Sequence, residues 1–375
     1  MIGGRGMPTT YGGIERAIEE LSVRLAARGH NVTVYCRTAY CDGRPPQHRG
    51  VHLRYLPAVN TKHLEAITHT ALATVDASFL RAFDVVHMHG TGPALLSPLA
   101  RAARQHVVAT VQGLDYRRDK WGAVARAVLR VGAWTAARAP HRTVVVSREL
   151  ERYYVERYGV DARFVPNGVA LPDHVPPSPP FALESGRYLL FLGRLVPEKD
   201  VHRLIDAYHD VPSDLPLVIA GPSSHSDDYV RTLQAAAERD HRVRLVGPVY
   251  GAEKEALLAH ARAFCQPSRL EGLPIALLEA LSYGRCAVAS DLPEHREVLS
   301  DDAAAAFVFR SGDTVSLRDT LTRVISDESA VARAGARGRQ IVAEHYDWND
   351  IVDRLEVVYR ELLAAARHVR QEVTA

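Results

Sequence analysis

Hydrophobic positions along the chain follow two alternating patterns. Short apolar runs rich in β-branched residues recur, and longer amphipathic segments with helical spacing lie between them. This alternation predicts an α/β fold with parallel sheets covered by helices on both faces. The predicted strands are Val32–Tyr35, Val51–Tyr55, Val85–Met88, Val107–Val111, Thr143–Val146, Tyr188–Leu192, Leu217–Ala220, Val243–Val246, Ala263–Gln266 and Ala287–Ser290.

The alternation is interrupted once and then starts again. The interruption is Leu171–Ser185, which holds five prolines and predicts an extended connection between domains. We predict a Rossmann-like domain over 1–170, a linker over 171–185, a second Rossmann-like domain over 186–346 and a final helix over 347–375. Helical spacing is clearest in the segments Ile14–Ala27, Ala123–Ala137, Tyr229–Glu238, Lys254–His260 and Asn349–Ala366.

Two carboxylates, Glu271 and Glu279, stand eight positions apart around a Gly-Leu-Pro turn. Because proline favours the first position of a helix, we expect a helix to begin at Leu273 or Pro274. The free N–H groups of its first turn would form an anion site. Glu279 lies among apolar residues and needs hydrogen-bond donors, for which the hydroxyls of a ligand are one source. A solvated position on the outer face of the helix is the alternative.

A second candidate site follows the strand Tyr188–Leu192. This strand runs into Gly193 and Arg194, and Lys199 stands five residues further along. A planar guanidinium and a compact ammonium suit a pyrophosphate, which carries at least two negative charges. Taken alone, the same residues also fit a solvated loop with a Glu198–Lys199 pair.

Together, the Gly-Arg-x-x-x-x-Lys element and the Glu-x7-Glu element resemble the signature of family 4 retaining glycosyltransferases. These enzymes have the GT-B fold, two Rossmann-like domains facing a central cleft, and the final helix crosses back onto the first domain. The resemblance implies that Arg194 and Lys199 stabilise the diphosphate, and that Glu271 contacts the sugar. It further implies donor contacts from Gly272, Leu273 and Pro274, ribose contacts from Glu279, and a backbone contact to the base near Val249.

The N-terminal segment departs from that pattern. Only Met1 and Ile2 precede a glycine-rich loop that ends in Gly12 and Gly13, whereas a doubly wound domain should open with a strand. The loop looks like that of a subfamily linked to rhamnosyl transfer and polysaccharide assembly. We hypothesise that the first strand is truncated or that the native start lies upstream; an intact mass matching Met1 to Ala375 would contradict an upstream start. Gly12 and Gly13 let backbone approach a phosphate or sugar, and a loop that only requires positive φ is the alternative.

Candidate acceptor or sugar contacts follow two strands of the first domain. His87 and His89 share one face at the carboxyl end of a strand, where open α/β sheets bind ligands. Gln112 stands where many members of the resembled family have histidine, and glutamine cannot accept the proton of a hydroxyl. Asp115 is the nearest carboxylate. Structural histidines and a loop-capping Asp115 are the alternatives. Gly90-x-Gly92 lacks the third glycine of a dinucleotide fingerprint, so NAD is not expected.

Composition narrows the classes of function. The chain has 375 residues and a formal charge of +2, which gives no general argument for nucleic acid. Four cysteines without a Cys-x-x-Cys pair indicate neither a disulfide framework nor a zinc site. No apolar run approaches the ~18 residues of a membrane span, and no signal peptide is seen, so we expect a cytoplasmic protein.

The segment from Arg117 to Arg142 is basic and amphipathic, with Val128 and Trp134 among arginines and Lys120. It either touches anionic lipid at the inner membrane surface, where a lipid-linked acceptor would reside, or forms a solvated face of a core helix.

The sequence therefore predicts a retaining glycosyltransferase that moves a hexosyl or deoxyhexosyl group from a nucleoside diphosphate sugar to a glycan or lipid-linked acceptor. No Asp-x-Asp pair is present, so we expect no metal and no other cofactor, with the two cations stabilising the diphosphate. Two alternatives remain. A nucleotide-sugar epimerase of the same fold would isomerise sugars without an acceptor, and an inactive scaffold subunit would not bind a nucleotide sugar.

Overall fold

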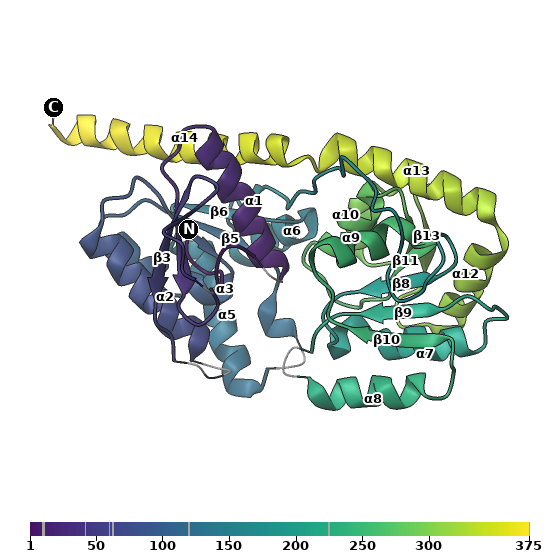
Figure 1. Cartoon of the computed structure of the whole chain (residues 1–375). Helices are drawn as coiled ribbons and strands as arrows, with labels where there is room; N and C mark the ends of the chain where they lie inside the picture. The colour runs from purple at the N-terminus through teal and green to yellow at the C-terminus, as the bar shows by residue number, and fades with distance from the viewer. Residues whose placement is uncertain are drawn as a thin grey trace. The chain divides into compact units, whose positions relative to one another are not determined.

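All ten predicted strands form in the computed structural model, each within two residues of its expected ends. The structure describes residues 1–9, 12–41, 43–59, 61, 64–118, 121–223 and 226–374. These form two compact units, one of Met1–Asn167 with Trp348–Ala375 and the other of Gly168–Asp347. The first unit holds two mainly parallel sheets and the second unit holds one, each with helices around it (Figure 1).

The proline-rich segment 171–185 belongs to the second unit, so the division lies at residue 168 rather than at 171. Hydrogen bonds hold the segment and its approach in place. The Val169 amide donates to the Tyr346 carbonyl at 2.8 Å, and His260 Nε2 lies 2.6 Å from the Pro176 carbonyl. An extended segment with such contacts is part of a domain surface rather than a free connection.

The first unit contains a three-stranded sheet of order β1-β3-β2 and a four-stranded parallel sheet of order β4-β5-β6-β7. Its strands are β1 Thr33–Arg37, β2 Gln47–His48, β3 Val51–Leu56, β4 Val86–His89, β5 Val107–Val111, β6 Arg142–Val145 and β7 Arg163–Phe164. Its helices are α1 Gly13–Ala27, α2 Glu65–Val75, η1 Asp76–Leu80, α3 Thr91–Ala94, α4 Ser97–Ala102, η2 Asp115–Arg117, α5 Ala123–Arg138, α6 Arg148–Tyr158 and α14 Trp348–Thr374.

Met1 and Ile2 lie between the two sheets of this unit. The Tyr35 amide of β1 donates to the Met1 carbonyl at 3.1 Å, and the Ile2 amide donates to the His87 carbonyl of β4 at 2.8 Å. Ile2 also forms a parallel bridge with Met88. These two residues therefore occupy the central strand position that the doubly wound pattern requires.

Helix α14 packs against α1 through a regular apolar stripe. Trp348, Ile351, Leu355, Val358 and Leu362 are buried in the same core as α1. Spacings of three and four residues place these side chains on one face of the helix. The final helix is thus part of the first unit.

The second unit is built on a six-stranded parallel sheet of order β10-β9-β8-β11-β12-β13. Its strands are β8 Leu189–Leu192, β9 Leu217–Ala220, β10 Val243–Gly247, β11 Ala263–Gln266, β12 Cys286–Ser290 and β13 Ala306–Phe309. Its helices are η3 Pro197–Lys199, α7 Val201–His209, α8 Asp227–Ala237, α9 Gly251–His260, α10 Ile275–Ser282, α11 Pro293–Val298, α12 Thr314–Ser326 and α13 Glu328–His345.

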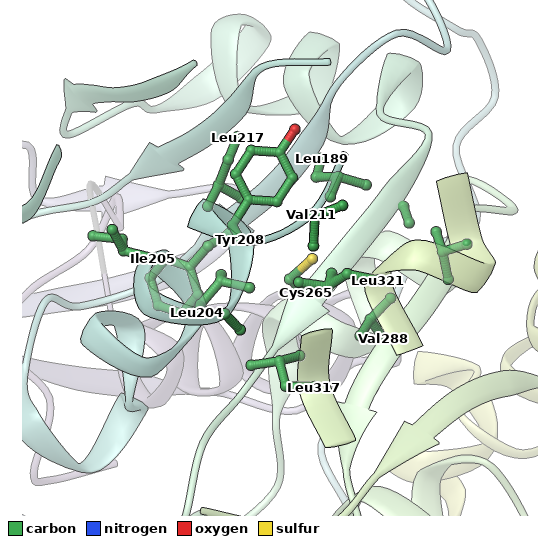
Figure 2. Packing of buried hydrophobic residues seen from close by; sticks show 14 of the residues in the cluster. Leu189, Leu204, Ile205, Tyr208, Val211, Leu217, Cys265, Val288, Leu317 and Leu321 are labelled. Atoms are coloured by element: carbon green, nitrogen blue, oxygen red, sulfur yellow. The ribbon is translucent and has the colours of Figure 1, made fainter. Parts of the chain in front are cut away.

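One face of this sheet carries the hydrophobic core shown in Figure 2. Leu204, Ile205 and Tyr208 of α7 and Leu317 and Leu321 of α12 pack onto it. The strands contribute Leu189, Leu217, Cys265 and Val288. Helices α9 and α10 lie on the other side of the sheet from α7 and α8 (Figure 1). In sheets covered by helices on both faces, ligands bind outside the carboxyl ends of the strands.

Over the part of the chain that the structure describes, no helix combines the length and apolarity needed to cross a bilayer.

Candidate functional site

The strand order of the second unit reverses between β8 and β11. From β8 the chain proceeds outward through β9 to β10, and from β11 it proceeds through β12 to β13 on the other side. In open α/β sheets, ligands bind outside the carboxyl ends of the strands at such a reversal. The loop after β8 carries Arg194 and Lys199, and the loop after β11 carries Glu271. The predicted catalytic residues therefore border this switch point.

Lys199 and Glu271 form an ion pair across the switch point. Lys199 Nζ lies 2.5 Å from Glu271 Oε1, and the two side chains are 15% and 8% exposed. Gln266 Nε2, at the end of β11, donates to the same oxygen. Burial alone would raise the pKa of Glu271, but Lys199 and other neighbours lower that pKa to about 2. A carboxylate with so low a pKa is a weak base, so Glu271 is suited to hold a ligand rather than to remove a proton.

Further contacts join the two loops of this pair. The Arg269 amide donates to the Glu198 carbonyl at 3.0 Å, and Arg269 Nε lies 3.3 Å from Asp200 Oδ1. Asp200 is buried with φ of 51°, in the left-handed region that aspartate tolerates better than most residues. These contacts fix Lys199, between Glu198 and Asp200, beside the Glu271 loop.

Backbone packing positions the loop of Arg194. A Cβ on Gly221, just after β9, would lie 1.8 Å from the Gly193 carbonyl oxygen. Only glycine allows this approach, and the φ of Gly221, 147°, also favours glycine. Arg194 is half-buried immediately after this contact, before Leu195 bridges to Ser223.

Helix α10 begins one residue later than the latest predicted start. It runs from Ile275 to Ser282, and Pro274 is its N-cap, with φ of −80° and ψ of 85°. That ψ is not helical, so Pro274 precedes the helix rather than occupying its first position. No described side chain caps this end. Gly272, Leu273 and Pro274, which precede the helix, are buried.

Glu279 has a partner that the sequence did not reveal. Lys254 Nζ of α9 lies 2.7 Å from Glu279 Oε1, and the Glu279 side chain is 17% exposed. The chain itself therefore supplies one donor to this carboxylate, through Oε1, and ligand hydroxyls as a further source stay a prediction. The residues are 25 positions apart on separate helices, so no local spacing signals the pair.

Val249 lies in the loop between β10 and α9 and is 6% exposed. Its loop leaves β10 at the same edge of the sheet as the loops of Lys199 and Glu271, since all six strands run parallel. Two further polar residues of this unit were not predicted. Gln266 ends the apolar strand β11, and His295 lies in α11, behind the Glu271 loop.

The two predicted site histidines, His87 and His89, are buried with partners inside the first unit. Their rings stack with centroids 4.1 Å apart, as the shared strand face predicts. His87 Nδ1 lies 2.6 Å from the Tyr359 hydroxyl of α14, and His87 Nε2 lies 2.7 Å from Thr110 Oγ1. Burial, the largest cause, lowers the pKa of both histidines. For His87 these contacts are those of a structural histidine, and they leave neither ring nitrogen for an acceptor.

Gln112 and Asp115 also have partners. Asn167 Nδ2 donates to Gln112 Oε1 at 2.9 Å. Asp115 opens the short helix η2, accepts from Thr91 Oγ1 at 3.1 Å and lies 3.0 Å from Arg118 Nε. The arrangement of Asp115 is that of the loop-organising carboxylate that the sequence left as its alternative.

The Gly12–Gly13 turn leads into α1. Gly12 has φ of 105° and is the N-cap of α1, which begins at Gly13. A Cβ on Gly12 would lie 2.1 Å from Glu15 Oε2, and Glu15 lies 3.8 Å from Arg5 Nε. The positive φ explains why glycine stands at position 12, because the Glu15 carboxylate ends a flexible side chain that could move aside. Thr10 and Tyr11 of the same loop, and Lys120 of the basic segment, lie outside the described residues.

Two protein-family models divide the chain between them. The family described as Glycosyltransferase Family 4 matches residues 11–171, and Glycosyl transferases group 1 matches residues 179–341. The chain belongs to glycosyltransferase family 4.

A curated relative of this glycosyltransferase is the phosphatidyl-myo-inositol mannosyltransferase of Mycobacterium leprae, 29% identical over 378 residues, which cover 96% of each chain. Among solved structures, sucrose-phosphate synthase from Thermosynechococcus elongatus aligns with a TM-score of 0.81 at 18% identity, covering 97% of this chain and 98% of that one. Anabaena HepE in complex with UDP-glucose aligns with a TM-score of 0.77 at 18% identity, covering 96% and 98%. The glycosyltransferase thus has the GT-B fold of two Rossmann-like domains.

Across the described ranges, no group of three or more His, Cys, Asp or Glu side chains is arranged to hold a metal ion.

Proposed function

We propose that this glycosyltransferase transfers a hexosyl or deoxyhexosyl group from a nucleoside diphosphate sugar to a glycan or lipid-linked acceptor, with retention of anomeric configuration. The observation that carries the proposal is the Lys199–Glu271 ion pair at the switch point of the second sheet, with Arg194 in the same loop as Lys199. The complex of Anabaena HepE with UDP-glucose, a neighbour of the same fold, supports a nucleotide-sugar donor.

Arg194 and Lys199 stabilise the departing diphosphate. When the bond between the anomeric carbon and the phosphate oxygen breaks, negative charge grows on the diphosphate. Fixed cations and the N–H groups at the start of α10 stabilise that charge where it develops. The two cations take the place of a metal ion, so activity should persist in EDTA.

Glu271 holds the transferred sugar through its hydroxyls. Its carboxylate is ionised because its pKa is about 2. The acceptor oxygen forms the new bond to the anomeric carbon from the side of the leaving group. The proton of the acceptor hydroxyl passes to the diphosphate oxygen that leaves, so no separate base is needed.

Glu279 holds the ribose of the donor. Lys254 fixes one carboxylate oxygen of Glu279 at 2.7 Å and orients the other toward ribose hydroxyls. The backbone near Val249 contacts the base. Gly12 and Gly13 of the first unit approach the donor phosphate or sugar, and His89, Gln112 and Asp115 remain candidates for the acceptor side.

A thermal-shift screen with UDP-glucose, GDP-mannose and dTDP-rhamnose tests the donor. At ligand concentrations ~100 times the Kd, one-site binding adds about 2.7 kcal/mol to the free energy of unfolding and raises Tm. We expect one nucleotide class to give such a shift, and that class names the donor. No shift with any of the three would favour the inactive scaffold instead.

The product of turnover separates transferase from epimerase. We expect the bound nucleotide sugar to release its nucleoside diphosphate when an acceptor is supplied, with the transferred sugar keeping its anomeric configuration by NMR. An isomerised nucleotide sugar formed without an acceptor would indicate the epimerase.

We further propose that one face of α5 rests on anionic lipid at the cytoplasmic membrane surface, where a lipid-linked acceptor would lie. Val124, Val128, Val131 and Trp134 are 80%, 48%, 54% and 55% exposed along this face. Arg126, Arg130 and Arg138 come from the same helix. An apolar stripe flanked by arginines fits the boundary between headgroups and acyl chains.

Vesicle binding tests this surface. We expect co-sedimentation with vesicles containing phosphatidylglycerol but not with pure phosphatidylcholine, and loss of binding in the Val124→Ser/Val128→Ser double variant. The matched control is Val315→Ser, which changes a 56% exposed valine of the second unit. Equal binding of both variants would contradict a role for α5.

A further inference from the structure

His295 is completely buried behind the Glu271 loop, and its tautomer is fixed by its contacts. His295 Nδ1 lies 2.9 Å from the Ser290 carbonyl oxygen and 3.1 Å from Ser290 Oγ. A carbonyl oxygen only accepts, so Nδ1 carries the proton and donates. Burial, the largest cause, lowers the pKa of His295, and the opposing effect of Glu271 is smaller. The imidazole is therefore neutral at neutral pH.

Ser290, at the end of β12, links His295 to the loop that follows the neighbouring strand β11. Its hydroxyl donates to the carbonyl of Ser268, the residue that opens the Glu271 loop. The only proton of Ser290 Oγ is used in that bond, so Oγ accepts from His295 Nδ1. One N–H group thus holds both the carbonyl and the hydroxyl of Ser290 in place.

The chain of hydrogen bonds continues to Glu271. Gln266 Nε2 donates to Ser268 Oγ at 2.9 Å and to Glu271 Oε1 at 2.5 Å. Each amide hydrogen of Gln266 therefore serves one partner. Gln266, Ser268 and Ser290 are all no more than 1% exposed, so water does not replace these bonds.

The other nitrogen of His295, Nε2, is buried without a hydrogen-bond partner in the described part of the chain. An unpaired buried acceptor destabilises the fold, and an apolar residue of similar size would avoid that penalty. A benefit of histidine at this position must then come from the bond that it does make, at Nδ1.

Resting on the proposed function of Glu271, we propose that His295 is a positioning residue for the transfer reaction. Its Nδ1–H group holds Ser290, and Ser290 holds the Ser268 carbonyl, so that Gln266 and Lys199 meet the Glu271 carboxylate in one fixed geometry. His295 acts through these groups and not by contact with the substrate.

Substituting His295 with asparagine or glutamine distinguishes the roles of its two ring nitrogens. The amide of His295→Asn reaches the place of Nδ1, whereas the amide of His295→Gln reaches the place of Nε2. We expect His295→Ala, His295→Gln and Ser290→Ala to raise hydrogen exchange of the peptide spanning residues 267–274 by about three- to tenfold, the range of one lost hydrogen bond. His295→Asn should stay within about twofold of the wild type. The reverse pattern, with glutamine preserving protection and asparagine losing it, would overturn the proposal.

Kinetics give a second readout. With the nucleotide sugar that shifts Tm most, His295→Ala should lower kcat about tenfold and leave the Kd of the nucleoside diphosphate within about threefold. The His295→Ala/Ser290→Ala double variant should be no slower than the slower single variant, because both changes break the same chain of bonds. Additive losses, or equal losses of kcat and of nucleotide affinity, would contradict positioning.

His69→Asn provides the matched control, because it changes a buried histidine of α2 in the first unit. This variant should leave both the exchange of 267–274 and kcat unchanged. If the wild type turned over none of the nucleotide sugars, the proposed function would fail, while the exchange pattern would still decide the role of His295.

Discussion

The two units of this glycosyltransferase differ in how they treat polar residues at strand ends. In the second unit, Lys199 and Glu271 pair with each other at the switch point and stay partly open to solvent. In the first unit, His87 is enclosed by Thr110 and by Tyr359 of α14. Both sets stand at the carboxyl ends of parallel strands, so position in the sheet alone does not distinguish a ligand site from a structural contact.

Charge makes the difference. Two hydrogen bonds satisfy both ring nitrogens of a buried neutral histidine, so such a residue can serve a purely structural role. A carboxylate and an ammonium held at low exposure need each other, and their pair shifts pKa values and leaves strong donors and acceptors for a charged ligand. The charged pair of the second unit is therefore the feature on which our proposed donor site rests, and the buried histidines of the first unit give no equivalent argument for an acceptor site.

The largest expected effect comes from Lys199→Ala. This change removes a cation from the leaving group and leaves the Glu271 carboxylate without its ion-pair partner. We expect donor turnover to fall about 10²–10³-fold, as for loss of one preorganised transition-state group. Initial rates of nucleoside diphosphate release measure it, with Arg318→Ala, a change in a surface pair with Asp319, as the control. If Lys199→Ala turned over the donor at the wild-type rate, Lys199 would have no catalytic role and the contrast between the two units would fail.

Arg194→Ala should lower the rate of nucleoside diphosphate release about as much as Lys199→Ala does. It should lower donor affinity less than it lowers this rate.

The pH dependence of stability should reveal the same ion pair. The pKa of Glu271 falls from 4.5 to about 2 in the folded protein. A lowered carboxyl pKa stabilises the fold above pH 4.5, and this contribution, up to about 3 kcal/mol, is lost as pH falls toward 2. The Tm difference between wild type and Glu271→Gln should be constant above pH 5 and shrink below it. A difference independent of pH down to 3 would contradict the lowered pKa.

Glu279→Ala should act on binding more than on rate. Loss of the hydrogen bonds that the ribose hydroxyls donate to a charged carboxylate should weaken nucleoside diphosphate binding about 10- to 100-fold, measured by calorimetry. Lys254→Ala should give a smaller loss in the same direction, because it only orients Glu279. Unchanged affinity in both variants would place the ribose elsewhere.

Substitutions around His87 in the first unit should lower the stability of the protein and leave its donor affinity unchanged. Tyr359→Phe removes one partner of His87 and should cost about 1–2 kcal/mol, seen as a lower Tm. The Kd for the nucleoside diphosphate should stay within about twofold of the wild type. A loss of donor affinity larger than the loss of stability would give His87 a functional role and weaken the contrast between the units.

The sequence predicted most of the architecture because buried parallel strands appear as continuous apolar runs. It missed β2 and β7, which have two residues each, and β13, Ala306–Phe309, which follows a run of alanines without a strand pattern. It assigned Lys199 and Glu271 to one donor site because both stand in motifs of the resembled family. The geometry of their pair could not be read from spacing.

Contacts between segments that are distant along the chain could not be predicted from the sequence. Lys254 and Glu279 are 25 residues apart, and His87 and Tyr359 are 272 residues apart. His295 belongs to no recognisable motif. Its proposed positioning role depends on the contact between Ser290, at the end of β12, and Ser268, which follows the adjacent strand β11. Such pairs depend on how helices pack on the sheet, which hydrophobic periodicity does not specify.

The central claim is that the donor site lies in the second unit around Lys199 and Glu271. Hydrogen exchange of the wild-type protein, with and without saturating UDP, GDP or dTDP, tests it most directly. We predict that the nucleotide that binds protects residues 193–200 and 266–279, and that the protection at 193–200 is lost in Lys199→Ala. Protection confined to the first unit, or none with any nucleotide, would contradict it.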